Sequence, residues 1–204
     1  LALTNLQFAD SGTYSVAVSN RVGLLTNAPA AALTVLSPPA VVAQPQNQKA
    51  VAGTTVSFAV GLQGTPTFFY QWLRDGTDLP GATTATLTLA NVQPADAGTY
   101  SVVITNAFGA VASAPAVLSV IQPPVIEVPP TSQSITQGGT ATFSVQASGT
   151  APLRYRWQFR SSSITGATNM SLTLTNVQPA SAGAYSVVIT NDAGAITSAP
   201  VTLT

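Results

Sequence analysis

The sequence contains no cysteine and no histidine, and charged residues make up only 6% of its 204 residues. Thiol nucleophiles, imidazole general bases and the usual zinc ligands are therefore missing. The six basic and six acidic residues balance, so we expect neither nucleic acid nor an anionic membrane surface as a partner. No apolar run approaches the roughly 18 residues that cross a bilayer. We therefore predict no enzyme activity, no cofactor, no metal and no membrane span in this segment.

What the sequence does contain is an internal repeat. The stretch Asp-Ala-Gly-Thr-Tyr-Ser-Val-Val-Ile-Thr-Asn at 96–106 has counterparts at 10–20 and 181–191. Each counterpart places a turn with glycine before an alternating run that is typical of a strand. Recurrence at a fixed period indicates an array of similar structural units. The tyrosine of the motif recurs at spacings of 86 and 85 residues, as Tyr14, Tyr100 and Tyr185.

The repeat divides the chain into three parts, which we call the first, second and third repeat. Residues 1–36 match only the last part of the later copies, and we predict the last three strands of a truncated domain there. Three strands bury little surface on their own, so we expect the natural chain to continue upstream. Residues 37–121 and 122–204 are predicted to be complete domains. Each opens with paired prolines, Pro38-Pro39 and Pro123-Pro124, which predict short, semi-rigid hinges and an end-to-end arrangement.

Short alternating runs separated by turn signals, with no helical period, predict an all-β chain. In the second repeat we expect strands over 56–60, 68–72, 86–89 and 100–105, and a hairpin turn at 106–109. The third repeat follows the same order. Such spacing is typical of an antiparallel β-sandwich.

Taken together, these residues resemble immunoglobulin-like domains of the I-set kind. That family has a cysteine, a tryptophan about a dozen residues later, and an Asp-x-Gly-x-Tyr-x-Cys corner before a later strand. Trp72 and Trp157 occupy the tryptophan position here, and Asp96-Ala97-Gly98 matches the acidic corner. The resemblance implies tandem immunoglobulin-like β-sandwiches, like beads on a string.

At the family's two cysteine positions this chain carries valine, as the pairs Val60 with Val102 and Val145 with Val187. The resemblance implies that each valine pair meets between the two sheets beside the tryptophan. A native disulfide in a small domain contributes roughly 2–5 kcal/mol, and each fully buried valine returns roughly 1.5–3 kcal/mol of it. The predicted structural core comprises Tyr14, Val16, Val60, Trp72, Tyr100, Val102, Val145, Trp157, Tyr185 and Val187.

Several residues allow a second interpretation. The tryptophans could be sugar-stacking platforms, but their place in the pattern favours the core. Asp10 and Asp96 share one repeat position and are expected to hold a turn by accepting backbone N–H bonds, since Ser181 fills that position in the third repeat. Asp75 and Asp78 offer two carboxylates, whereas calcium takes six to eight oxygens.

Two features differ between the repeats and are candidate contact sites. Phe69 on the tryptophan strand is replaced by Arg154 in the third repeat, and Phe108 at a hairpin tip is replaced by Ala193. Loop-tip aromatic residues often anchor contacts. The alternative for the arginines is a solvated sheet face. The candidate contact residues are Phe69, Phe108, Arg154, Arg156 and Arg160.

The cysteine-free pattern looks like tandem repeats of large secreted or surface proteins of bacteria. This resemblance implies an extracellular or cell-surface location and a non-catalytic structural or adhesive array, such as a spacer, stalk or fibre element. The expected partners are neighbouring repeats, other copies of the chain, or a surface glycan or protein. Two alternatives stay open, namely accessory modules of a large secreted polysaccharide-active enzyme and a surface-binding decoration of a phage.

Overall fold

The computed structural model describes residues 1–26 and 29–204; residues 27 and 28, within the predicted fragment 1–36, lie outside the described residues. The chain divides into two compact units. Unit 1 comprises Leu1–Gln48, Val56–Leu89 and Gly98–Leu118, and unit 2 comprises Lys49–Thr55, Ala90–Ala97 and Ser119–Thr204.

In the described part of the first repeat, four short strands pair as two separate ribbons, β1 with β4 and β2 with β3. Its elements are η1 (Phe8–Asp10), β1 (Gly12–Tyr14), β2 (Ala17–Ser19), β3 (Leu24–Thr26) and β4 (Ala31–Leu33).

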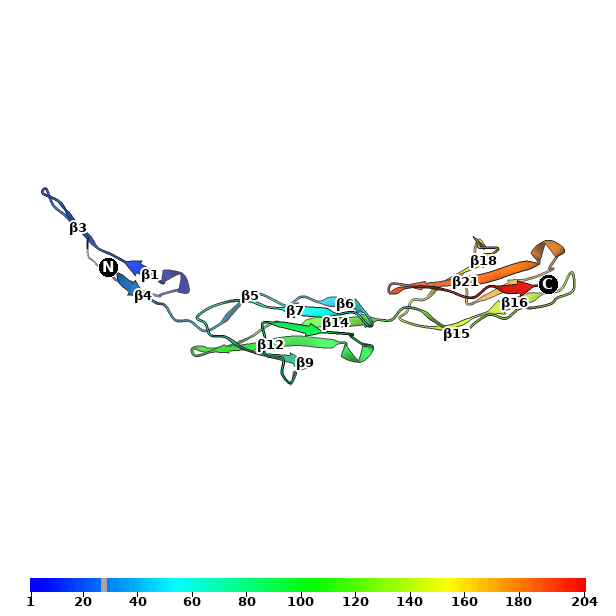
Figure 1. The fold of residues 1–204 in the computed structure, drawn as a ribbon, viewed down its shortest axis with the longest axis horizontal. Coiled ribbons are helices and arrows are strands. Elements are labelled where there is room, and N and C mark those ends of the chain that lie inside the picture. Colours follow the sequence, from blue (N-terminus) through cyan, green and yellow to red (C-terminus); the bar gives the residue numbers. More distant parts are fainter. Residues whose placement is uncertain (27–28) are drawn as a thin grey trace. The chain divides into compact units, whose positions relative to one another are not determined.

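The second repeat forms a larger sheet in the order β10-β9-β12-β14-β6, in which β13 also pairs with β12 (Figure 1). Two further strand pairs of this repeat, β11 with β7 and β5 with β8, lie outside this sheet. Its elements are β5 (Ala40–Ala43), β6 (Gln48–Val51), β7 (Val56–Ala59), β8 (Gly61–Gln63), β9 (Phe69–Arg74), β10 (Thr77–Asp78), β11 (Thr86–Leu89), η2 (Pro94–Asp96), β12 (Gly98–Asn106), β13 (Gly109–Ala112) and β14 (Ala116–Ile121).

The third repeat has the matching sheet in the order β19-β18-β21-β22, with β23 also paired to β21. The pairs β16–β20 and β15–β17 lie outside this sheet, and a parallel bridge joins Gln133 to Leu203. Its elements are β15 (Val125–Val128), β16 (Ala141–Ser144), β17 (Gln146–Ser148), β18 (Arg154–Phe159), β19 (Ser162–Ser163), β20 (Ser171–Leu174), η3 (Pro179–Ser181), β21 (Gly183–Asn191), β22 (Gly194–Thr197) and β23 (Val201–Leu203).

The core of the third repeat lies between two sheets. Strands β16 and β20 supply one side of it, and β18, β21 and β23 supply the other. Alternation along each strand explains this, because successive side chains point to opposite faces and only every second residue is buried. The buried cluster contains Ala141, Phe143, Val145, Trp157, Leu172, Val177, Tyr185, Val187, Ile189, Val201 and Leu203.

The prediction of an all-β chain of sandwich repeats is confirmed. The expected hairpin is present as well, because Asn106 pairs with Gly109 at the turn between β12 and β13. Gly109 has a φ of +156°, a backbone conformation that glycine adopts without strain. No helix among the described residues has the length and apolar character needed to cross a membrane.

Candidate functional site

Both tryptophans are fully buried and cannot serve as sugar-stacking platforms. The Trp72 indole N–H donates to the Thr84 carbonyl at 2.8 Å, and the Trp157 indole N–H donates to the Asn169 carbonyl at 3.0 Å. A buried indole needs such an acceptor, because an unpaired polar group in the core is costly. Both side chains are therefore structural.

Each tryptophan belongs to a group of three aromatic rings, with one phenylalanine and one tyrosine. In the third repeat, the Phe143 ring stacks on Tyr185 with ring centroids 5.0 Å apart and lies 6.1 Å from Trp157. The second repeat repeats this arrangement, with 5.0 Å from Phe58 to Tyr100 and 6.3 Å from Phe58 to Trp72. Such ring pairs add about 0.5–1.5 kcal/mol beyond the area that they bury.

The valines at the family's cysteine positions differ in burial. Val102 and Val187 are fully buried and lie directly opposite Trp72 and Trp157 on the neighbouring strand. Val145 is also buried, in the same cluster as Trp157 and Val187. Val60 is only half-buried, so its pair is less enclosed than the pair in the third repeat.

The corner tyrosines act as structural hydrogen-bond donors. The Tyr14 hydroxyl donates to the Asp10 carbonyl and the Tyr185 hydroxyl to the Ser181 carbonyl, both at 2.8 Å. Tyr100 is buried at the same position of the second repeat. Burial raises the pKa of Tyr185, while the nearby Arg160 charge partly opposes the rise.

The acidic corner position holds a turn, as expected. In each repeat its side-chain oxygen accepts a hydrogen bond from the backbone N–H three residues earlier. The distance is 2.7 Å for each of the two aspartates and 3.3 Å for the serine that replaces them. These pairs are Gln7 with Asp10, Gln93 with Asp96, and Gln178 with Ser181.

The prediction of a core position for Val16 is wrong. Its side chain is 59% exposed, and Tyr14 is only half-buried. The strands of the first repeat form two separate ribbons, and within the described residues no second sheet packs on them as it does in the third repeat. The sequence pattern for an inward-facing residue is therefore present where nothing encloses it.

Asp75 closes the turn between β9 and β10. Its Oδ1 accepts hydrogen bonds from the Thr99 backbone N–H at 2.8 Å and from the Thr99 hydroxyl at 2.9 Å, and Arg74 Nε lies 3.6 Å from its Oδ2. The bonds from Thr99, aided by the Arg74 charge, lower the pKa of Asp75. Among the described residues, no group of three or more metal-binding side chains occurs, and Asp75 is engaged as a structural acceptor.

The candidate contact residues on the tryptophan strands point outward. Phe69 is 65% exposed, and Arg154 and Arg156 are also exposed at alternating positions of β18. Arg154 lies 3.7 Å from Asp192, which also receives a 3.0 Å hydrogen bond from the Lys49 ammonium group. This bond and the Lys49 charge lower the pKa of Asp192.

Arg160 and Phe108 occupy turns. The Arg160 guanidinium lies 4.8 Å above the Phe159 ring and donates to the Ala182 carbonyl at 2.9 Å. It is therefore used within its own repeat, where it fills the position of Asp75 in the second. Phe108 is 45% exposed at the hairpin between β12 and β13.

The sequence analysis missed a glutamine that lines a groove in every repeat. It follows two residues after an asparagine with a left-handed backbone, with φ between 52° and 55°. The glutamine Nε2 donates to the carbonyl of that asparagine at 3.0–3.2 Å, which fixes the side chain. The signal was the recurrence of Asn-x-Gln before each corner. The three pairs are Asn5 with Gln7, Asn91 with Gln93, and Asn176 with Gln178.

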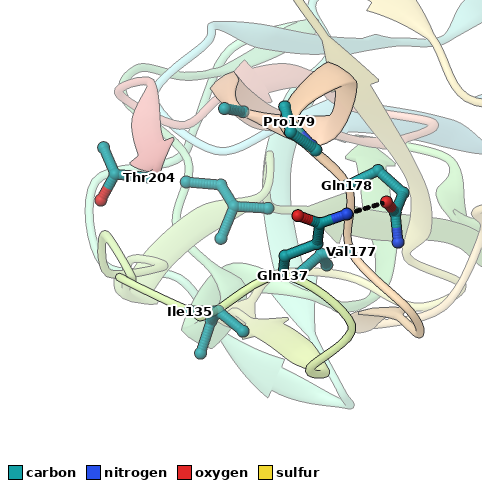
Figure 2. A pocket seen from close by; sticks show the side chains of 8 residues that line it. Ile135, Gln137, Val177, Gln178, Pro179 and Thr204 are labelled. Atoms are coloured by element: carbon teal, nitrogen blue, oxygen red, sulfur yellow. Dashed lines mark hydrogen bonds between the residues drawn. The ribbon is translucent and has the colours of Figure 1, made fainter.

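In the third repeat this groove has a volume of about 210 Å³ (Figure 2). Its lining is mainly apolar and includes Ile135, Val177 and Leu203. Gln137 Nε2 donates to Gln178 Oε1 at 2.8 Å at its polar rim. The groove is smaller than the roughly 300–1,000 Å³ of typical small-molecule sites.

Comparison with known proteins gives one family. The sequence model described as "Immunoglobulin domain" matches residues 38–106 and 123–191. Human Roundabout homolog 2 is 31% identical over 219 residues, which cover 96% of this chain and 16% of that protein. Human "Cell adhesion molecule DSCAML1" is 31% identical over 160 residues, which cover 72% of this chain and 8% of that protein. The chain thus spans less than a fifth of the length of these two relatives.

Solved structures agree in fold. A three-domain fragment of titin superposes with a TM-score of 0.73 at 22% identity, covering 98% of this chain and 76% of the fragment. Extracellular domains 3–5 of Drosophila OTK give a TM-score of 0.63 at 25% identity, covering 97% of this chain and 72% of that chain. The likeness to titin concerns the fold alone.

Proposed function

Because this chain belongs to the immunoglobulin domain family, we propose that it is a non-catalytic spacer within an extracellular or cell-surface protein of adhesion type. The domain division 1–36, 37–121 and 122–204 is part of this proposal. The relatives named above are animal proteins and give no support to the bacterial source predicted from the sequence. That source therefore stays a prediction.

One observation carries the proposal: the repeats share their interior and differ on their outward faces. Tryptophan, stacked aromatic rings and the corner recur in register in the second and third repeats. On the outward face, by contrast, Phe69 in one repeat is replaced by Arg154 in the next. A recurring interior with variable faces favours an array whose task is to extend a chain, with its neighbouring repeats as partners.

The experiment places residues 37–204 between a cell-surface anchor and a reporter binding domain. Without a spacer, the reporter is too close to the surface to capture its ligand on an opposing bead. We expect capture to be restored by this segment and kept when Phe69→Ser, Arg154→Ser and Arg156→Ser alter the outward faces. Deleting residues 122–204 should lower capture, because it removes one of the two complete repeats from the spacer.

A direct adhesive role predicts a different result. In that case the segment itself would attach cells to beads that carry a glycan, a protein or a second copy of the segment, even when the reporter is absent. The face substitutions would then remove this attachment. That outcome would overturn the spacer proposal.

A further inference from the structure

Two grooves in the described residues are lined by equivalent positions of the repeat. Within unit 1, Gln7 lines a groove with Pro38 and Gly64. Within unit 2, Gln93 lines a groove with Pro123 and Gly149. Corresponding residues of the two grooves are separated by 85 or 86 positions, so in both grooves the glutamine of one repeat and the proline start of the next share the lining.

The proline side is held by its own repeat. In the third repeat, Asn191 Nδ2 donates to the Gln122 carbonyl at 2.7 Å and to the Thr150 carbonyl at 2.9 Å. A Cβ on Gly149 would lie 2.9 Å from the Pro123 carbonyl oxygen, so only glycine allows this approach. The paired prolines are therefore fixed to the repeat that follows them.

The second repeat builds its proline side from the corresponding residues. Asn106 Nδ2 donates to the Ser37 and Thr65 carbonyls, each at 2.8 Å. A Cβ on Gly64 would lie 2.6 Å from the Pro38 carbonyl oxygen. The hinge predicted from the sequence is therefore held on one side, because the repeat that follows the prolines fixes their start.

The glutamine side is complete in the third repeat too. Asn176 holds Gln178 as Asn91 holds Gln93, and the adjoining groove is apolar, with Val177 and Leu203 in its lining. Pyrrolidine rings are compact and apolar, and a volume of about 210 Å³ suits them better than a larger ligand.

We propose that the Gln178 groove is the docking site for the start of a further immunoglobulin repeat, with its paired prolines seated against Gln178. The proposal rests on the proposed function, since an array of spacers needs defined joints. The occupant is a repeat of the same kind, which carries the Pro-Pro element, the glycine and the clamping asparagine described above.

The test appends a second copy of residues 120–204 directly after Thr204. Thr204 occupies the position of Ser119, so the register of the existing joint is kept. The matched control carries ten Gly/Ser residues between Thr204 and the appended copy. Methyl NMR of Ile135, Val177 and Leu203 reads the groove in both proteins.

We expect these methyl signals to shift in the directly joined protein and to show nuclear Overhauser effects to the appended proline rings, but to match the parent chain in the control. Identical methyl spectra in the joined protein and the control would overturn the proposal. A second measurement needs no appended copy: in residues 1–204, the Gln93 side-chain amide should show a nuclear Overhauser effect to the Pro123 ring. If this effect is absent, the proposed joint is also overturned. The capture assay can succeed even when the joints are flexible. Failure of the joint proposal and failure of the spacer proposal are therefore distinguishable.

Discussion

Removing a single hydroxyl from Tyr185 tests how the corner stabilises a repeat. Tyr185→Phe deletes the 2.8 Å hydrogen bond to the Ser181 carbonyl and keeps the ring stacked on Phe143. Because Ser181 is half-exposed, water can satisfy the freed carbonyl, and the loss should stay within the net value of one hydrogen bond. We expect the free energy of unfolding to fall by about 0.5–1.5 kcal/mol.

The matched control is Tyr155→Phe. Tyr155 is also half-buried against the core, but within the described residues its hydroxyl makes no hydrogen bond to the protein. Its removal should therefore change stability by less than about 0.5 kcal/mol. Urea unfolding followed by Trp157 fluorescence, with Trp72→Phe in every protein compared, isolates the third repeat. Equal midpoints for the two variants would refute the role assigned to the corner.

Three further predictions follow from burial and charge. Val102→Ala should destabilise the second repeat by about 1–3 kcal/mol, and by more than Val60→Ala, because Val102 is fully buried and Val60 is not. Urea unfolding followed by Trp72 fluorescence, with Trp157→Phe in every protein compared, reads this repeat, and equal losses for the two variants would contradict the prediction. Asp75 has a lowered pKa, so its contribution is present above pH 3.8 and is lost as the pH falls through the folded-state pKa; Asp75→Asn should flatten the acid side of the stability curve, and an unchanged curve would contradict this. Tyr185 has a raised pKa, so its contribution is present below pH 10.0 and is lost as the pH rises through the folded-state value; Tyr185→Phe should reduce the alkaline loss of stability, and an equal loss in both proteins would count against it.

Much of the fold was predictable because it follows from local patterns. The period of 85 or 86 residues located equivalent strands, and alternation identified the buried faces around Trp72 and Trp157. Glycine and asparagine favour the backbone conformations that tight turns require. The hairpin at 106–109 could therefore also be predicted from the sequence.

The features that could not be predicted depend on parts of the chain that are far away in the sequence. Val16 carries the pattern of an inward-facing residue, but a pattern says nothing about whether a second sheet covers it. Asp75 could be considered as a calcium ligand until its bonds to Thr99 were known, because a side-chain acceptor 24 residues from its donor leaves no local signal. The Gln178 groove was missed because Asn-x-Gln acquires meaning only where the repeats adjoin.

The measurement that tests the account most directly is single-molecule extension of residues 37–204 held at both ends. An array of independently folded spacer repeats predicts two separate unfolding steps of nearly equal length. Each step should release about 85 residues, which extend to about 30 nm at ~3.5 Å per residue. A single cooperative step, or two steps of clearly unequal length, would contradict the account.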